Sequence, residues 1–466
     1  MNHEFSEKTG HKLMRVVMIT LALSAMAALM FNFVLPDISK TFGLTNAQVS
    51  WVTSSYALIY GLGTIIYGNL ADRYQLKHLL TIGLILFAIG SLVGFSSQGY
   101  WMVILGRCLQ AAGAAAIPAV AMVIPVLYFP PERRGIASGT AFVGLSIGTA
   151  LGPVLSSFIV GVAHWRFLFL FPLLLLLTLP FYRKYLVGER QGGTNGFDWL
   201  GGSLLAATVT QILLGVTGGT WWLILLGLMT LLLFVIRIRI ATKPFVQPQL
   251  FTKQYSMRLV IAFLVSGIGF SLYFLTPLLL ADVQKLPSSW IGYAMVPAAV
   301  ASALLGKWGG RLADTRGSTS LFSLASGSLF LCFLLLSTFT GASPLYIAVF
   351  LILGNVGQTF MMIAISQSLS QSLPKEQAGV GMGFLTMLNF IGGGFAAGVY
   401  GKVVDIGSEV HWNPVNTNPN GITFSNVFLV LALLHVGLLA FYYFQFARHK
   451  QDQGKPRFYK KGGETI

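Results

Sequence analysis

Fourteen apolar stretches recur along the chain between residue 13 and residue 446. A transmembrane α-helix needs about 20 mostly apolar residues to cross the hydrocarbon core of a bilayer, and each stretch is close to that length. The sequence therefore predicts an all-α polytopic membrane protein, with spans at residues 13–35, 47–68, 79–97, 101–125, 135–158, 164–182, 198–217, 220–238, 258–280, 289–309, 318–339, 344–366, 379–403 and 424–446.

The first apolar stretch could be mistaken for a secretory signal peptide, because Lys12 and Arg15 lie at its start. It is too long for the apolar region of a signal peptide, and it lacks a small-residue cleavage site. We therefore expect this stretch to be retained as the first span.

The charged residues are few and unevenly placed. Only 9% of the residues are charged and 55% are hydrophobic, whereas soluble domains carry roughly 25% charged residues. If the chain starts in the cytoplasm, its Lys and Arg residues fall in cytoplasmic segments or at their edges, apart from Lys40, Arg107, Arg166, Lys285 and Lys402. This asymmetry predicts a cell-membrane protein with both termini in the cytoplasm. The net charge of +16 thus sets orientation, and we expect no nucleic-acid partner.

Two sequence patterns occur twice at nearly the same separation. Residues 68–73 (GNLADR) follow the second span and residues 310–314 (GRLAD) follow the tenth, while residues 132–139 (ERRGIASG) open the fifth and residues 376–383 (EQAGVGMG) open the thirteenth. Both members of each pair lie on the predicted cytoplasmic side, so the halves are parallel copies. The separation leaves room for about two spans more than six helices need.

The repeat predicts two parallel six-helix bundles joined by a two-helix insert. The predicted units are an N-terminal bundle at 1–190, the insert at 191–245, a C-terminal bundle at 246–447 and a basic cytoplasmic tail at 448–466. Parallel six-helix halves that rock around a site at the membrane midplane are typical of secondary transporters.

The loop after the second span carries the most widely shared motif. Residues 68–77 (GNLADRYQLK) resemble the corresponding loop of the major facilitator superfamily, and the chain as a whole resembles its fourteen-helix drug/proton antiporter branch, which includes tetracycline exporters of Gram-positive bacteria. The loop departs from the pattern at Gln75, where glycine is usual. Charges in such a loop can bond to helix ends in one state and release them in the other. We expect a gating role, against a static turn, for Gly68, Asp72, Arg73, Lys77 and Asp314.

The fourth span contains an arginine, Arg107, within residues 107–115 (RCLQAAGAA), which are similar to the family's helix-4 motif. A charged side chain inside a span is costly and usually faces a bundle interior. We expect Arg107 to tune a proton-carrying carboxylate or to bind an anionic group of the substrate. The alternative is an arginine that extends to the lipid headgroups.

The fifth span carries Gly144, Gly148 and Gly152 four residues apart, followed by Pro153. Such spacing permits close approach of another helix, and proline can bend the span. In the resembling proteins this element marks antiporters and is thought to prevent proton leak. Simple packing of small residues is the alternative.

No acidic residue lies in the middle of any span, although resembling antiporters commonly carry one in the first. A proton antiporter needs a group that binds and releases a proton. We expect Asp37, within reach of Arg107, to be the carrier, although Asp37 could instead cap a short helix that starts at Ile38. Asp282 is the next candidate and Asp405 a weaker one, while the mid-span His435 is expected to be a packing residue.

The resemblance implies a central cavity lined by the first, fourth, ninth and twelfth spans, with contributions from four others. Amides and tyrosines can orient a ligand there, while aromatic and methionine surfaces accept flat apolar bodies. The residues expected to bind substrate are Asn32, Tyr56, Tyr60, Gln110, Tyr273, Asn355, Gln358 and Asn389, together with Phe31, Phe274 and Met361. Helix packing is the alternative role for each.

The chain lacks a phosphate-binding loop and the motifs of metal or nucleophilic catalysis. We expect no enzyme activity, metal or cofactor, and a proton gradient as the energy source. The predicted function is export of tetracycline-like or lipophilic cationic drugs in exchange for protons, by a monomer that confers antibiotic resistance. The alternatives are an exporter of an endogenous metabolite or siderophore, and a receptor or scaffold that transports nothing.

Overall fold

A computed structural model describes residues 3–71, 74–130, 134–186, 198–242, 244, 245, 248, 251–373 and 378–447. Every regular element in these ranges is a helix. Fourteen helical segments are long and apolar enough to cross a membrane, and each matches a predicted span to within several residues. The prediction of fourteen membrane helices is confirmed.

The N-terminal half comprises α1 (His3–Leu29), η1 (Met30–Phe33), α2 (Leu35–Phe42), α3 (Asn46–Ala71), α4 (Leu76–Phe95), α5 (Tyr100–Ala114), α6 (Ala116–Tyr128), α7 (Arg134–Val162), η3 (Trp165–Phe169), η4 (Phe171–Thr178) and α8 (Leu179–Tyr185). The insert comprises α9 (Trp199–Gly218) and α10 (Trp221–Ile240). The C-terminal half comprises α11 (Lys253–Asp282), α12 (Ser288–Arg316), α13 (Ser318–Thr338), α14 (Pro344–Ser370), α15 (Ala378–Ile406), η7 (Pro419–Gly421), α16 (Ile422–Tyr442) and a π-helical turn at Tyr443–Ala447.

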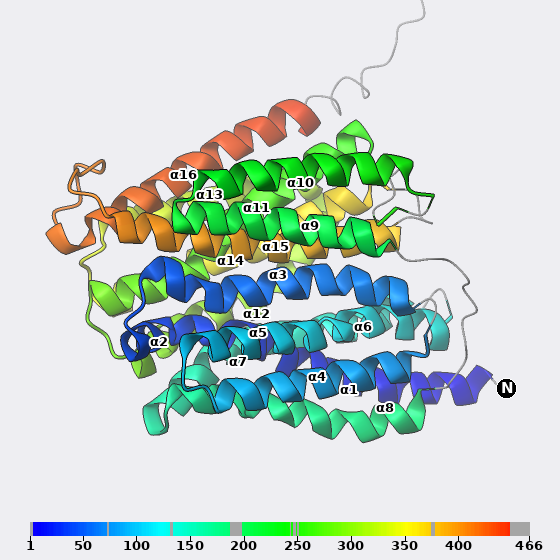
Figure 1. Cartoon of the computed structure of the whole chain (residues 1–466). Coiled ribbons are helices and arrows are strands. Elements are labelled where there is room, and N and C mark those ends of the chain that lie inside the picture. The colour runs from blue at the N-terminus through cyan, green and yellow to red at the C-terminus, as the bar shows by residue number, and fades with distance from the viewer. Residues whose placement is uncertain are drawn as a thin grey trace, which may run out of the picture.

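Most helices of the first half lie below those of the second in Figure 1, and the two halves meet chiefly along two helix pairs, α3 with α15 and α7 with α12. The sequence repeat makes α12 the counterpart of α3, and α15 the counterpart of α7. The α3–α15 contact and the α7–α12 contact are therefore equivalent under the repeat. This equivalence is expected for parallel halves related by an axis along the bundle. The architecture of two parallel bundles with a two-helix insert agrees with the prediction, while the exact domain limits remain predictions.

The helices run roughly side by side, so the bundle has two ends (Figure 1). We call the end at which α1 begins and α16 finishes the termini side, which lies to the right in Figure 1. The other end, which contains α2, the start of α3 and the end of α15, is the opposite side.

The insert covers one of the two seams. Helix α9 contacts both α3 and α15, and its Leu213 is fully buried in a cluster with Leu58 and Leu62 of α3 and Met387 and Ile391 of α15. Only Gly227 and Phe234 of α10 are buried, so α10 forms the outer layer. The insert thus seals the seam between α3 and α15, and its outer helix presents a face apolar enough for lipid.

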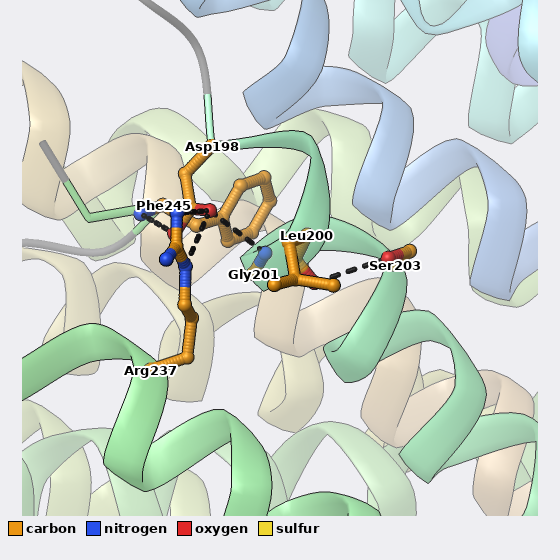
Figure 2. A network of polar contacts seen from close by, with 6 residues as sticks. All are labelled: Asp198, Leu200, Gly201, Ser203, Arg237 and Phe245. Carbon is orange, nitrogen blue, oxygen red and sulfur yellow. Dashed lines mark hydrogen bonds and ion pairs between the residues drawn. The ribbon is translucent and has the colours of Figure 1, made fainter. Parts of the chain in front are cut away.

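A buried carboxylate fastens the insert at the termini side (Figure 2). Asp198 caps the start of α9 by accepting the N–H of Gly201 at 3.0 Å, and it also accepts the N–H of Phe245 at 3.2 Å. Arg237, at the end of α10, pairs with the same carboxylate at 3.0 Å. One side chain therefore joins both insert helices to the segment that leads into α11.

The first and the sixth spans contain segments of 3-10 helix. The first changes to a 3-10 turn at Met30–Phe33 and restarts as α2, with Pro36 in the first turn of α2 where its missing N–H is tolerated. The sixth span is 3-10 helical over most of its length, from Trp165 to Thr178. The apolar pattern predicted both spans but gave no indication of these changes.

Candidate functional site

Arg107 of α5 is fully buried at the centre of the N-terminal half. Its Nη1 donates to the carbonyl of Ala27 at 3.0 Å and its Nη2 to that of Ala28 at 3.3 Å, while its Nε donates to Val52 at 3.2 Å. The guanidinium carbon lies 4.0 Å from the ring centre of Tyr56 and 4.4 Å from that of Phe31. Three main-chain oxygens and two aromatic faces therefore stabilise the charge.

The break in the first span explains the partners of Arg107. The last carbonyls of an α-helix lack intrahelical donors, and α1 ends at Leu29, just after Ala27 and Ala28. The guanidinium fork supplies donors to these carbonyls. The suggestion that Arg107 extends to headgroups is therefore wrong.

The observed partners of Arg107 also differ from the carboxylate that was expected. Within the described part of the chain, Arg107 pairs with no carboxylate, and Asp37 is not among its hydrogen-bonding partners. Asp37 lies in the first turn of α2, whose N-cap is Val34, so the expectation that Asp37 caps a helix beginning at Ile38 is also wrong. Main-chain oxygens take the place that a carboxylate was expected to fill.

An aromatic column leads from Arg107 to the other half. The ring of Tyr56 stacks on that of Tyr60, with centres 5.8 Å apart and an interplanar angle of 16°. The Tyr60 ring then lies 4.3 Å from that of Phe390 on α15. The column crosses the seam between the halves, so a movement of one half against the other would separate Tyr60 from Phe390.

Two amides predicted to bind substrate lie in the same region. Gln110 accepts a hydrogen bond from Arg107 at 3.2 Å and donates to Ser91 of α4 at 2.8 Å, which fixes the position of the guanidinium. Asn32 in η1 accepts from Thr53 at 2.7 Å, and its buried Nδ2 has no partner among the described residues. An unpaired buried N–H group is costly, which makes the Nδ2 of Asn32 a donor available to a ligand.

The glycines of α7 pack against α1 in the same half. A Cβ at Gly144 would overlap the carbonyl oxygen of Met18, and one at Gly148 would overlap that of Ala22. At Gly152 the nearest atom, the Cβ of Leu29, would be 3.8 Å away. The close approach of α1 therefore requires glycine at Gly144 and Gly148 but not at Gly152. A role of these glycines in antiport stays a prediction.

Pro153 lies inside α7, where the two halves touch on the opposite side. The carbonyl of Pro153 lies against Gly292 of α12 so closely that a Cβ at Gly292 would overlap it. Four residues further along α7, the hydroxyl of Ser157 donates to the carbonyl of Ser288 at 3.5 Å. The α7–α12 seam is thus closed at this end.

The three amides predicted to bind substrate in the C-terminal half have different surroundings. Asn355 donates to the carbonyl of Leu351 in its own helix at 3.1 Å. Asn389 accepts from Ser266, which joins α15 to α11. Gln358 packs against Gly269 of α11, and its Oε1 is buried with no partner among the described residues. The remaining residues, Tyr273, Phe274 and Met361, lie on α11 and α14, with Tyr273 partly buried and the other two fully buried.

Three of the predicted gating residues, Gly68, Lys77 and Asp314, lie at the termini side. Asp72 and Arg73 fall outside the described residues, so their roles stay predictions. Gly68 has open space around its Cα, and Lys77 is half-buried in the first turn of α4. In the second half, Asp314 accepts a hydrogen bond from Gln367 of α14 at 3.1 Å, so α12 is bonded to a neighbour within its own half.

The two leading candidate proton carriers lie at one end of the bundle, and the mid-span His435 lies elsewhere. Asp37 and Asp282 both lie toward the opposite side, where α2 contacts α11. His435 is fully buried in α16, where its ring lies 5.7 Å from that of Phe333 and both ring nitrogens lack partners among the described residues. Helix α16 packs chiefly on α13, away from the α3–α15 and α7–α12 seams.

A family model described as Major Facilitator Superfamily matches residues 17–397. Among curated proteins, the riboflavin transporter RibZ of Clostridioides difficile (strain 630) is 24% identical over 383 residues, which cover 80% of this chain and 83% of the relative. Multidrug resistance protein 3 of Bacillus subtilis (strain 168) is 26% identical over 326 residues, which cover 67% of this chain and 64% of the relative.

Solved structures share the fold at low sequence identity. A bacterial homolog of the human lysosomal transporter Spinster, in an inward-facing and unoccupied conformation, superposes with a TM-score of 0.67 at 15% identity, covering 96% of this chain and 99% of that chain. A POT family transporter in complex with a thioalcohol-conjugated peptide gives a TM-score of 0.66 at 14% identity, covering 91% of this chain and 95% of that chain.

Proposed function

The chain belongs to the Major Facilitator Superfamily, and we propose that this transporter exports drug molecules across the cell membrane in exchange for protons. The observation that carries the proposal is the column formed by Arg107, Tyr56, Tyr60 and Phe390. It leads from a buried positive charge in the first half, through three aromatic rings, to the seam across which the halves must move.

The closed seams support transport by alternating access. Hydrogen bonds between the halves, such as that from Ser54 to Gly394 at 2.6 Å and that from Ser157 to Ser288, lie toward the opposite side. Rocking that breaks these contacts would open the site to the opposite side.

The proposed orientation places the termini side in the cytoplasm. Drug then enters from the cytoplasm or inner leaflet, and protons enter from outside. Asp37 and Asp282 lie at the outer end under this orientation, where protons would arrive. We retain Asp37 as the first candidate carrier and Asp282 as the second. We assign Arg107 to the geometry of the site and not to proton transfer, because its charge has no carboxylate partner in the described residues.

The chemistry of the site favours flat aromatic substrates. Stacked tyrosines accept planar rings, and the free Nδ2 of Asn32 offers a hydrogen-bond donor beside them. Tetracycline-like and lipophilic cationic drugs with fused rings meet the aromatic requirement. A relative whose name is multidrug resistance protein 3 is consistent with this class.

The second candidate function is export of an endogenous metabolite with a planar ring system. The similarity to a riboflavin transporter favours it, and Arg107 would then hold an anionic group of the metabolite. Both candidates share the same fold and the same site, so transport of a panel of compounds must separate them.

Efflux from cells that overproduce the protein tests the proposal. Preloaded ethidium and tetracycline should leave these cells faster than cells with an empty vector, and a protonophore should abolish the difference because it removes the proton gradient. Riboflavin efflux from the same cells, without efflux of ethidium or tetracycline, would indicate a metabolite exporter and not a drug exporter. Efflux of none of the three compounds would favour a receptor or scaffold.

A further inference from the structure

The end of α15 completes the start of α3. Asp405, in the last turn of α15, accepts the N–H of Asn46 at 2.8 Å and its side-chain Nδ2 at 3.0 Å through Oδ1. Its Oδ2 accepts the N–H of Ala47 at 2.7 Å. These residues are more than 350 positions apart in the sequence and belong to different halves.

The N–H groups in the first turn of α3 need hydrogen-bond acceptors from elsewhere, because the first N–H groups of a helix have no intrahelical acceptor. Thr45 and Gln48 form a capping box, in which Gln48 N–H donates to the hydroxyl of Thr45 at 3.2 Å and Thr45 N–H donates to Gln48 Oε1 at 3.0 Å. The N–H groups of Asn46 and Ala47 are left over, and Asp405 takes both. The carboxylate also faces the positive end of the α3 dipole.

The backbone of α15 next to Asp405 approaches the start of α3 closely. Gly401, one turn before Asp405, lies against Asn46 and Ala47 so closely that a Cβ there would be 2.5 Å from the carbonyl oxygen of Asn46. Further along the same seam, the hydroxyl of Ser54 donates to the carbonyl of Gly394. The contact is therefore the outermost point of a continuous close approach between α3 and α15.

We propose that Asp405 is a latch that holds the α3–α15 seam shut on the opposite side and is released when the transporter opens there. The three bonds join the halves directly, so they must break when α3 and α15 separate at this end. The latch presupposes alternating access, but it does not depend on the identity of the substrate or on proton coupling.

Distance measurement by double electron–electron resonance tests the latch without any substrate. Spin labels replace Trp101 of α5 and Trp290 of α12, which are exposed on the opposite side and belong to different halves. Cys108 and Cys332 are first changed to serine and alanine. The Asp405→Ala variant should increase the population with a long distance about fivefold, as expected for loss of a helix-capping carboxylate of average strength. The Asp405→Asn variant, which keeps one acceptor oxygen, should show a smaller increase.

Glu409→Ala is the matched control. Glu409 is an exposed carboxylate four residues after Asp405, and its change removes the same charge. An unchanged distance distribution in Asp405→Ala, or an equal increase in Glu409→Ala, would overturn the latch. A monodisperse elution profile for each variant excludes misfolding as the cause. Failure of drug efflux with a shifted distance distribution would leave the latch standing and count against the proposed substrate.

Discussion

Arg107→Ala should reduce drug efflux by at least tenfold at matched protein abundance. The change removes the charge between Tyr56 and Phe31 and leaves the carbonyls of Ala27, Ala28 and Val52 without their donor. An unsatisfied buried acceptor costs ~1–3 kcal/mol, and where that cost falls on the conformation that binds drug, about 1.4 kcal/mol corresponds to a tenfold loss of rate. Efflux of ethidium, normalised to the amount of protein in the membrane, measures the effect.

Arg166 offers a matched control for the chemistry of Arg107. Its Nε also donates to a main-chain oxygen, that of Ser97 at 2.8 Å, and its guanidinium lies 4.7 Å from the ring of Trp165, but it is only half-buried on the opposite side. Arg166→Lys should retain most of the efflux. Arg107→Lys should lose it, because a lysine ammonium cannot replace the planar fork at a buried site. Full efflux by Arg107→Ala would remove this residue from the transport mechanism.

Gly148→Ala should lower both the melting temperature in detergent and drug efflux. The new methyl group would overlap the carbonyl oxygen of Ala22 and lie 2.8 Å from the Cβ of Ala25, so α7 would have to move away from α1. Overpacking of this kind costs ~1–3 kcal/mol, whereas alanine gains at most about 1 kcal/mol over glycine in helix propensity. Fluorescence-detected thermal unfolding measures the change.

Gly152→Ala separates packing from a part in antiport. The nearest atom to a Cβ at Gly152 is 3.8 Å away, so the melting temperature should stay at or above that of the parent. If α7 also limits proton leak, this variant should lose coupling while its melting temperature is unchanged. Equal destabilisation by Gly148→Ala and Gly152→Ala would contradict the packing described for α7.

The sequence predicted the arrangement of the helices well, because two physical constraints act on it directly. The bilayer thickness sets the length of each apolar stretch, and the repeated motifs around Gly68 and Gly310 show that the halves are copies. The 3-10 turn at Met30–Phe33 was missed because an apolar run looks the same in either helix type. The contact of α9 with α3 and α15 was missed because it depends on side chains distant in sequence.

The site was predicted less completely. A buried charge at Arg107 follows from its position in an apolar span, but its partners are main-chain oxygens, which carry no sequence signal. The sequence therefore suggested Asp37 as an acidic partner, but Asp37 is not among the hydrogen-bonding partners of Arg107. Asp405 was considered only as a weak proton carrier, since nothing in the sequence shows that it meets Asn46. Near that contact, the one local sequence signal was the capping-box pattern of Thr45 and Gln48, which marks the start of α3.

Proton movement in proteoliposomes tests drug/proton antiport most directly. The purified protein is reconstituted with a pH-sensitive dye inside, and ethidium or tetracycline is added on one side. Drug movement should drive protons in the opposite direction, with no signal from protein-free liposomes, and Asp37→Asn should reduce the coupling. Unchanged coupling in that variant would remove Asp37 as the carrier. Drug transport that moves no protons would contradict antiport itself.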